Sequence, residues 1–200
     1  MNYLAHVYLS GDSDEVKVGN FIGDYVKGKN YKQYTELIQK GILIHRNIDT
    51  FTDMHPIIRR SKSHLNPKYH KYSGIIIDIF YDHFLANEWE NFSKESLKKF
   101  VYHFYEILIL HFSILPKRVK QFLPIFILNN WLESYLTIEG IGVVLHRMTK
   151  RTSLPDYTKF AIDDLGRNYE KYREDFYDFF PKLIQFVEEK HQVGIKRPEK

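Results

Sequence analysis

The sequence contains no cysteine and no apolar run long enough to cross a membrane. The absence of Cys excludes disulfide bonds, thiolate metal ligands and a cysteine nucleophile, so any metal site must use imidazole, carboxylate or amide donors. A membrane-spanning helix needs about 20 mostly apolar residues, and the first residues lack the basic and apolar segments of a secretion signal. We therefore expect a cytoplasmic protein with no membrane partner.

Neither sign of charge is dominant. Lys and Arg number 29 against 25 Asp and Glu, which gives a net charge of +4. This mild basic excess favours acidic partners but does not choose among nucleic acid, phosphorylated metabolites and acidic proteins. Hydrophobic residues make up 44% of the chain and charged residues 27%, as in ordinary globular proteins. We predict one compact domain over residues 1–193 and a disordered tail over residues 194–200.

The apolar residues recur at three- and four-residue steps along most of the chain, which is typical of amphipathic helices. Gly and Pro separate the segments, and a turn is expected at Asn66–Pro67 and a bend at Pro181. The expected helices cover residues 14–26, 31–53, 57–62, 74–89, 97–115, 117–136, 138–150 and 157–189. The predicted fold class is therefore all-α, a compact single-domain helical bundle.

Three pairs of metal-binding side chains occur at the helical spacing i, i+4, which places both members of a pair on one helix face. They are Asn20 with Asp24, His45 with Asp49, and Asp78 with Asp82, and His83 follows directly. Residues 74–88 contain no Lys or Arg, so a buried Asp78 or Asp82 needs a partner from elsewhere. A shared Mn²⁺, Mg²⁺, Fe²⁺ or Zn²⁺ ion would supply one. The alternative is that these residues are helix caps, surface residues or paired polar groups of the core.

Other polar residues leave more than one interpretation open. His6 could be a metal ligand, a donor to a carboxylate or a packing residue. Arg46 could hold a phosphate oxygen or form a surface salt bridge. The basic segments 59–62, 117–120 and 147–151 suit either an acidic partner protein or a solvated face. The aromatic clusters favour packing between helices over base stacking, so no nucleic-acid partner is expected.

Five segments resemble the bacterial acyl carrier protein phosphodiesterases, also called holo-acyl carrier protein hydrolases. They are MNYLAH (1–6), GNFIGDYVKG (19–28), HRNID (45–49), DIFYDHFL (78–85) and YDFFP (177–181). The resemblance implies a divergent histidine-aspartate phosphohydrolase fold. It also implies a divalent ion, typically Mn²⁺, and a role in fatty acid metabolism. The expected reaction cleaves the phosphodiester that joins 4′-phosphopantetheine to a serine of the acidic carrier protein.

The matching motifs contain the residues that we expect to form the site. The expected metal ligands are His6, Asp24, His45, Asp49, Asp82 and His83, and the expected catalytic groups are Asp24, Arg46 and Asp78. Asp24 and Asp78 could either complete the metal shell or act as general base. Two alternatives remain open: a phosphohydrolase of a nucleotide or other small phosphate ester on the same fold, and a non-enzymatic helical module that binds an acidic protein.

Overall fold

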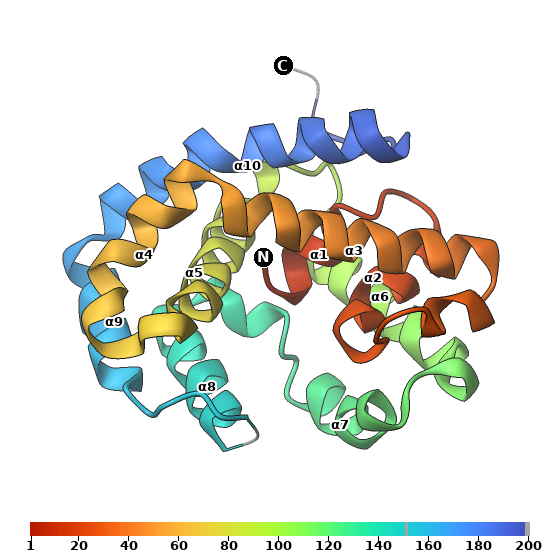
Figure 1. Cartoon of the computed structure of the whole chain (residues 1–200), viewed down its shortest axis with the longest axis horizontal. Coiled ribbons are helices and arrows are strands. Elements are labelled where there is room, and N and C mark those ends of the chain that lie inside the picture. The colour runs from red at the N-terminus through yellow and green to blue at the C-terminus, as the bar shows by residue number, and fades with distance from the viewer. Residues whose placement is uncertain (151, 199–200) are drawn as a thin grey trace.

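All regular secondary structure is helical within residues 1–150 and 152–198, which are the residues that the computed structural model describes (Figure 1). The all-α prediction is confirmed. The α-helices are α1 (Tyr3–Tyr8), α2 (Asp14–Ile22), α3 (Glu36–Met54), α4 (Pro56–Tyr69), α5 (Ser73–Asn87), α6 (Leu97–Leu110), α7 (Lys117–Leu128), α8 (Ile138–Thr149), α9 (Thr158–Arg167) and α10 (Tyr169–His191). The short 3-10 turns are η1 (Gly23–Tyr25), η2 (Asn30–Gln33), η3 (His70–Tyr72), η4 (Trp89–Asn91), η5 (Phe112–Ile114) and η6 (Glu133–Leu136). None of the described helices has both the length and the apolar character needed to cross a bilayer.

Helices α2 and α3 form the closest helix pair near the site. A Cβ atom on Gly19 would lie 2.2 Å from the carbonyl oxygen of Ile38, and one on Gly41 would lie 2.2 Å from that of Val16. Only glycine permits such backbone contact. This explains why helix-weakening glycines occur within these two helices.

Helix α5 forms the centre of the molecule and contacts α1, α4, α8 and α10. Eleven of its residues are buried, among them Ile76, Phe80 and Phe84. A helix that is apolar on nearly all sides must be covered on all sides. The central helix predicted over residues 74–89 is therefore confirmed, apart from its last residues, which form η4.

Several predicted boundaries are wrong. The segment 157–189 is two helices, α9 and α10, which meet at Asn168. Pro67, where a turn was expected, lies inside the last turn of α4. Pro181, where a bend was expected, lies inside α10 and does not end it. The helix predicted over residues 14–26 ends at Ile22, and Asp24 lies in the 3-10 turn η1. This last difference affects the site, because a tighter turn changes the direction in which Asp24 points.

The described part of the C-terminal segment lies against the body of the molecule. Ile195 is 7% exposed, and its N–H donates to a carboxylate oxygen of Glu188 over 3.2 Å. Arg197 pairs with Glu188 at 2.8 Å and Lys196 with Asp12 at 2.8 Å. These contacts differ from the disordered tail expected from the sequence for residues 194–198, whereas residues 199–200 lie outside the described residues.

Candidate active site

Helices α1 and α3 bring two histidines and one aspartate to a common point. The carboxylate of Asp49 lies between the two rings, with Oδ1 3.2 Å from His6 Nε2 and Oδ2 3.1 Å from His45 Nε2. The rings stack with their centroids 4.1 Å apart. Asp24 approaches from η1, with Oδ1 3.4 Å from His45 Nε2. We call His6, His45, Asp49 and Asp24 the imidazole–carboxylate cluster.

Asn20 determines which nitrogen of His6 faces the cluster. The Asn20 side-chain amide nitrogen donates to the carbonyl oxygen of His6 over 2.7 Å, and this carbonyl can only accept. The amide oxygen must therefore be the atom that lies 2.8 Å from His6 Nδ1, and this ring nitrogen must be the donor. In the neutral ring, Nε2 then presents its lone pair toward Asp49. Metal-binding histidines commonly have their tautomer fixed by an acceptor on the other ring nitrogen, the role that the Asn20 amide oxygen has here.

His45 is buried beside the carboxylates of Asp24 and Asp49 but forms no hydrogen bond of good geometry with them. It is 5% exposed, and neither ring nitrogen has a partner of hydrogen-bonding geometry among the described residues. Burial favours the neutral ring, but the carboxylates of Asp24 and Asp49 together raise the pKa of His45 to about 9. Buried imidazole nitrogens next to carboxylate oxygens form a donor set that a divalent cation would satisfy.

The pKa values of Asp49 and His6, two other groups of the cluster, are both lowered. Although burial opposes ionisation, the contacts with His45 and His6 hold the pKa of Asp49 well below its usual range. Burial and the neighbouring His45 lower the pKa of His6, so this ring is neutral near pH 7. The cluster therefore combines a neutral imidazole with a strongly ionised carboxylate, and both are forms that bind metal.

Gly23 makes room for the His45 ring. A Cβ atom on Gly23 would lie 2.3 Å from Cγ of His45, closer than two carbon atoms can approach. The sequence signal for this contact was present, since Gly23 lies directly before Asp24, but only the structure identifies the ring that needs the space.

Replacing Gly23 with Ala is expected to displace the His45 ring and to weaken Mn²⁺ binding by about 10–100-fold, the range for loss of a ligand-orienting contact. Isothermal titration calorimetry measures this affinity. Gly166→Ala is the matched control, because no atom lies within 4 Å of the Cβ that it adds. Equal Mn²⁺ affinity in both variants would mean that the position of His45 does not control metal binding.

Asp82 lies outside the imidazole–carboxylate cluster. Its carboxylate is fully buried and accepts hydrogen bonds from the backbone N–H of Leu4 at 2.7 Å and from those of Ala5 and Asn2 at 3.3 Å. Burial raises its pKa to about 7. Asp82 thus satisfies the free N–H groups at the start of α1. It was expected to bind metal, but the structure places it where it holds the helix that carries His6.

His83 also points away from the cluster, because consecutive residues of a helix point about 100° apart. Its Nδ1 lies 2.7 Å from the carbonyl oxygen of Tyr135, and its Nε2 lies 3.0 Å from the hydroxyl of Tyr169. Both ring nitrogens therefore have partners on η6 and α10. The expected ligand His83 instead links α5 to these two elements.

The remaining expected site residues also have partners. Arg46 donates to the carbonyl oxygens of Val26 and Gly28 over 2.8 and 2.9 Å. It therefore stabilises the loop after η1 rather than facing the cluster. Asp78 lies 3.0 Å from the amino group of Met1. Asp78 nevertheless borders the same pocket as Asp24 and Asp49.

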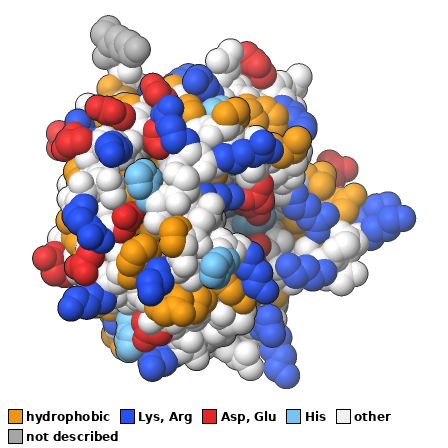
Figure 2. Space-filling view, turned by 60° about the vertical axis from the view of Figure 1, so that its left-hand side comes forward, with side chains coloured by type: hydrophobic (Ala, Val, Ile, Leu, Met, Phe, Trp, Pro, Cys, Tyr) orange, Lys and Arg blue, Asp and Glu red, His pale blue; other side chains and the backbone are white. Residues whose placement is uncertain are grey.

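This pocket has a volume of about 380 Å³ and combines acidic and basic walls. Asp24, Asp49, Lys62 and Lys71 are all among the residues that line it. The space-filling view shows a hollow with acidic and histidine side chains inside it and Lys or Arg side chains around its rim (Figure 2). Thr52, 3% exposed, also lines the pocket, and its hydroxyl has no partner among the described residues. We call this space the acidic pocket.

Sequence reasoning missed Thr52 and did not single out the two lysines. Thr52 lies three residues after Asp49, so the helical spacing of α3 could have identified it. Lys62 was noted only as part of the basic segment 59–62, and Lys71 carried no signal. Arg151, the last residue of the basic segment 147–151, lies outside the described residues.

Known proteins of one family match this chain over nearly its whole length. A family model described as acyl carrier protein phosphodiesterase matches residues 1–183. A protein of that name from Serratia proteamaculans is 29% identical over 191 residues, which are 95% of this chain and 99% of the relative. Others from Yersinia enterocolitica and Enterobacter sp. are 27% and 29% identical and cover 95% and 92% of this chain and 99% and 96% of their own. No solved structure matches significantly.

Proposed function

Because the chain belongs to the acyl carrier protein phosphodiesterase family, we propose that it hydrolyses the phosphodiester that joins 4′-phosphopantetheine to a serine of holo-acyl carrier protein. The observation that supports this proposal is the imidazole–carboxylate cluster at the edge of the acidic pocket. His6, His45 and Asp49 each offer a donor atom, and these atoms lie within 4.8 Å of one another. The products would be apo-acyl carrier protein and 4′-phosphopantetheine.

We propose that His6, His45 and Asp49 hold a divalent ion, with Asp24 within reach of the same point. The donors are nitrogen and oxygen only, which suits Mn²⁺ and also permits Mg²⁺, Fe²⁺ or Zn²⁺. A bound divalent ion lowers the pKa of a coordinated water and polarises a phosphoryl oxygen. The atom that fits such an ion is His45 Nε2, which lies 3.1 Å from Asp49 and 3.4 Å from Asp24 but forms no hydrogen bond of good geometry with either carboxylate.

The protein groups around the cluster would orient the substrate and move protons. Asp24 is 64% exposed at its side chain and is therefore free to accept a proton from the attacking water. Lys62 and Lys71, across the acidic pocket, would attract the phosphoryl oxygens. Lys62 pairs with Asp53 at 3.2 Å and packs over Gly74, so its ammonium group is held at the pocket.

Metal binding is expected to release close to one proton per ion between pH 7 and 8. The pKa of His45 is raised to about 9, so the ring is protonated in the metal-free protein and must lose its proton to bind metal. Affinity should therefore fall as pH falls. Calorimetric titration in buffers of different ionisation enthalpy measures the release. A ring with the usual pKa of about 6.5 would release only about 0.1 proton at pH 7.5, which would contradict this prediction.

The function is tested by incubating the protein with holo-acyl carrier protein and Mn²⁺, with and without a chelator, and measuring the carrier mass. Loss of the mass of 4′-phosphopantetheine only when the ion is present would support the proposal. An unchanged carrier together with hydrolysis of nucleotides or other small phosphate esters would favour the first alternative. An unchanged carrier, no turnover of small esters and no bound metal would favour a non-enzymatic module.

A further inference from the structure

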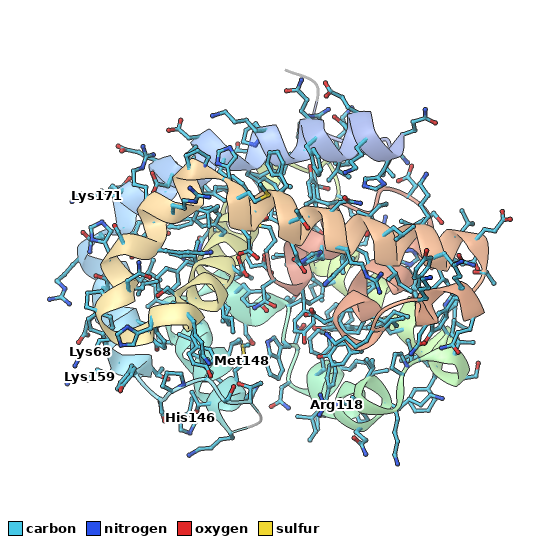
Figure 3. The ribbon with its side chains drawn as sticks, in the orientation of Figure 1. Lys68, Arg118, His146, Met148, Lys159 and Lys171 are labelled. Atoms are coloured by element: carbon cyan, nitrogen blue, oxygen red, sulfur yellow. The ribbon has the colours of Figure 1, made fainter. Side chains whose placement is uncertain are left out.

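A second pocket, with a volume of about 410 Å³, is lined mainly by aromatic side chains. Tyr3, Tyr25, Phe122 and Trp131 are among them. Figure 3 shows Arg118 on α7 and Met148 on α8, two helices that contribute to the walls of this pocket. We call it the aromatic pocket. Its volume lies within the range of about 300–1,000 Å³ that is typical of sites for small molecules.

The aromatic pocket and the imidazole–carboxylate cluster use neighbouring residues of the same turn, η1. Tyr25 lines the pocket and directly follows Asp24 in η1. The hydroxyl of Tyr25 lies 2.8 Å from that of Tyr3, so the two rings form one wall. Helix α1 likewise contributes Tyr3 to the pocket and His6 to the cluster, so α1 and η1 each take part in both sites.

Arg118 supplies a cation to the lining of this pocket. The side chain is exposed and forms no hydrogen bond or ion pair with any described residue. Arg118 lines the aromatic pocket together with Tyr25. An unpaired guanidinium beside an apolar pocket suits a ligand with a phosphoryl group at one end and an uncharged chain behind it.

We propose that the aromatic pocket binds the pantetheine arm of the substrate, with Arg118 at its phosphoryl end. This inference rests on the proposed function. Pantetheine is an uncharged chain of methyl, methylene and amide groups. Its apolar parts match the aromatic wall and Met148, and its amides match Gln121 and Thr152, which also line the pocket. A folded carrier protein is too large for this space, so the carrier would remain outside, near Lys62 and Lys71.

The test fills the pocket from the exposed residue Gln121. Gln121→Trp is expected to lower kcat/KM for holo-acyl carrier protein by at least about 10-fold, because it occupies the space of the arm. Hydrolysis of methyl 4-nitrophenyl phosphate, which has no such arm, should change less than about twofold. Leu128→Trp is the matched control, since this residue of α7 is 86% exposed and does not line the pocket.

Binding of the free arm provides a measurement that does not depend on turnover. Calorimetry should show that Gln121→Trp weakens both pantetheine and 4′-phosphopantetheine at least about 10-fold. Arg118→Met should weaken only the phosphorylated ligand, and it serves as the second variant if Gln121→Trp does not fold. Carrier hydrolysis with unchanged binding and kcat/KM in both variants would overturn the inference and leave the proposed function standing. Pantetheine binding without carrier hydrolysis would support the pocket and overturn the proposed function.

Discussion

Replacing His45 with Ala is expected to lower kcat/KM for holo-acyl carrier protein by more than about 100-fold, since removing even an outer partner of a metal ligand costs about 10–100-fold. The physical reason is that His45 supplies a buried nitrogen next to the carboxylates of both Asp24 and Asp49. Initial rates at saturating Mn²⁺ give kcat/KM, and a metal titration of the same variant shows whether binding of the ion is lost.

His83→Ala is the matched comparison, because it also removes one imidazole from the interior. His83 has its partners on η6 and α10 and does not face the cluster. We expect its kcat/KM to remain within about 10-fold of the wild-type value once the rate is corrected for the fraction of folded protein. An equal loss of kcat/KM in His45→Ala and His83→Ala would contradict the conclusion that His83 lies outside the cluster. It would indicate that His83 is a metal ligand.

Replacing Asp82 with Ala is expected to lower the free energy of unfolding by about 3–5 kcal/mol, since it leaves several buried N–H groups without an acceptor. The affected groups belong to Asn2, Leu4 and Ala5 at the start of α1. For a chain of this length the corresponding decrease in Tm is about 6–20 °C. Urea denaturation followed by circular dichroism measures the change.

Asp82→Asn is the control, because it keeps one acceptor oxygen and resembles the protonated acid. The decrease in the free energy of unfolding should be smaller for Asp82→Asn than for Asp82→Ala. The pKa of Asp82 is raised from 3.8 to about 7, so the folded state retains a proton that the unfolded state loses. The stability of the wild type relative to Asp82→Asn should therefore be greatest near pH 4 and fall as pH rises through 7. A pH-independent difference between the two proteins would show that Asp82 is ionised throughout.

The parts of the fold that follow from local pattern were predicted correctly. Apolar spacing identified α5 and most of α3, because a helix repeats every 3.6 residues whatever surrounds it. The same spacing placed His45 and Asp49 on one face of α3, where the structure has them in contact. The pair Asn20 and Asp24 was misread for a local reason. The helix tightens to a 3-10 turn at Gly23, so Asp24 belongs to the cluster. Asn20 instead accepts a hydrogen bond from His6 Nδ1, the ring nitrogen that faces away from Asp49.

The contacts of the site residues could not be predicted, because they depend on segments far apart in the chain. Asp82 and His83 have the residue types of metal ligands, but Asp82 meets the start of α1 and His83 meets η6 and α10. A buried carboxyl group can find its partner either in a cation or in backbone N–H groups. Sequence cannot distinguish the two cases when the partner lies about 80 positions away, as Leu4 does from Asp82.

The amino-acid sequence by itself determined that this chain is helical, that any metal donors must be nitrogen and oxygen atoms, and that its motifs resemble one enzyme family. These properties depend on side-chain chemistry and on spacing within one helix. Only the tertiary structure decided that His6, His45, Asp49 and Asp24 share a point, and that aromatic side chains of α1, η1 and α7 line one pocket. Those relations depend on how α1, α3, η1 and α7 pack, because burial and distance arise only when separate segments meet.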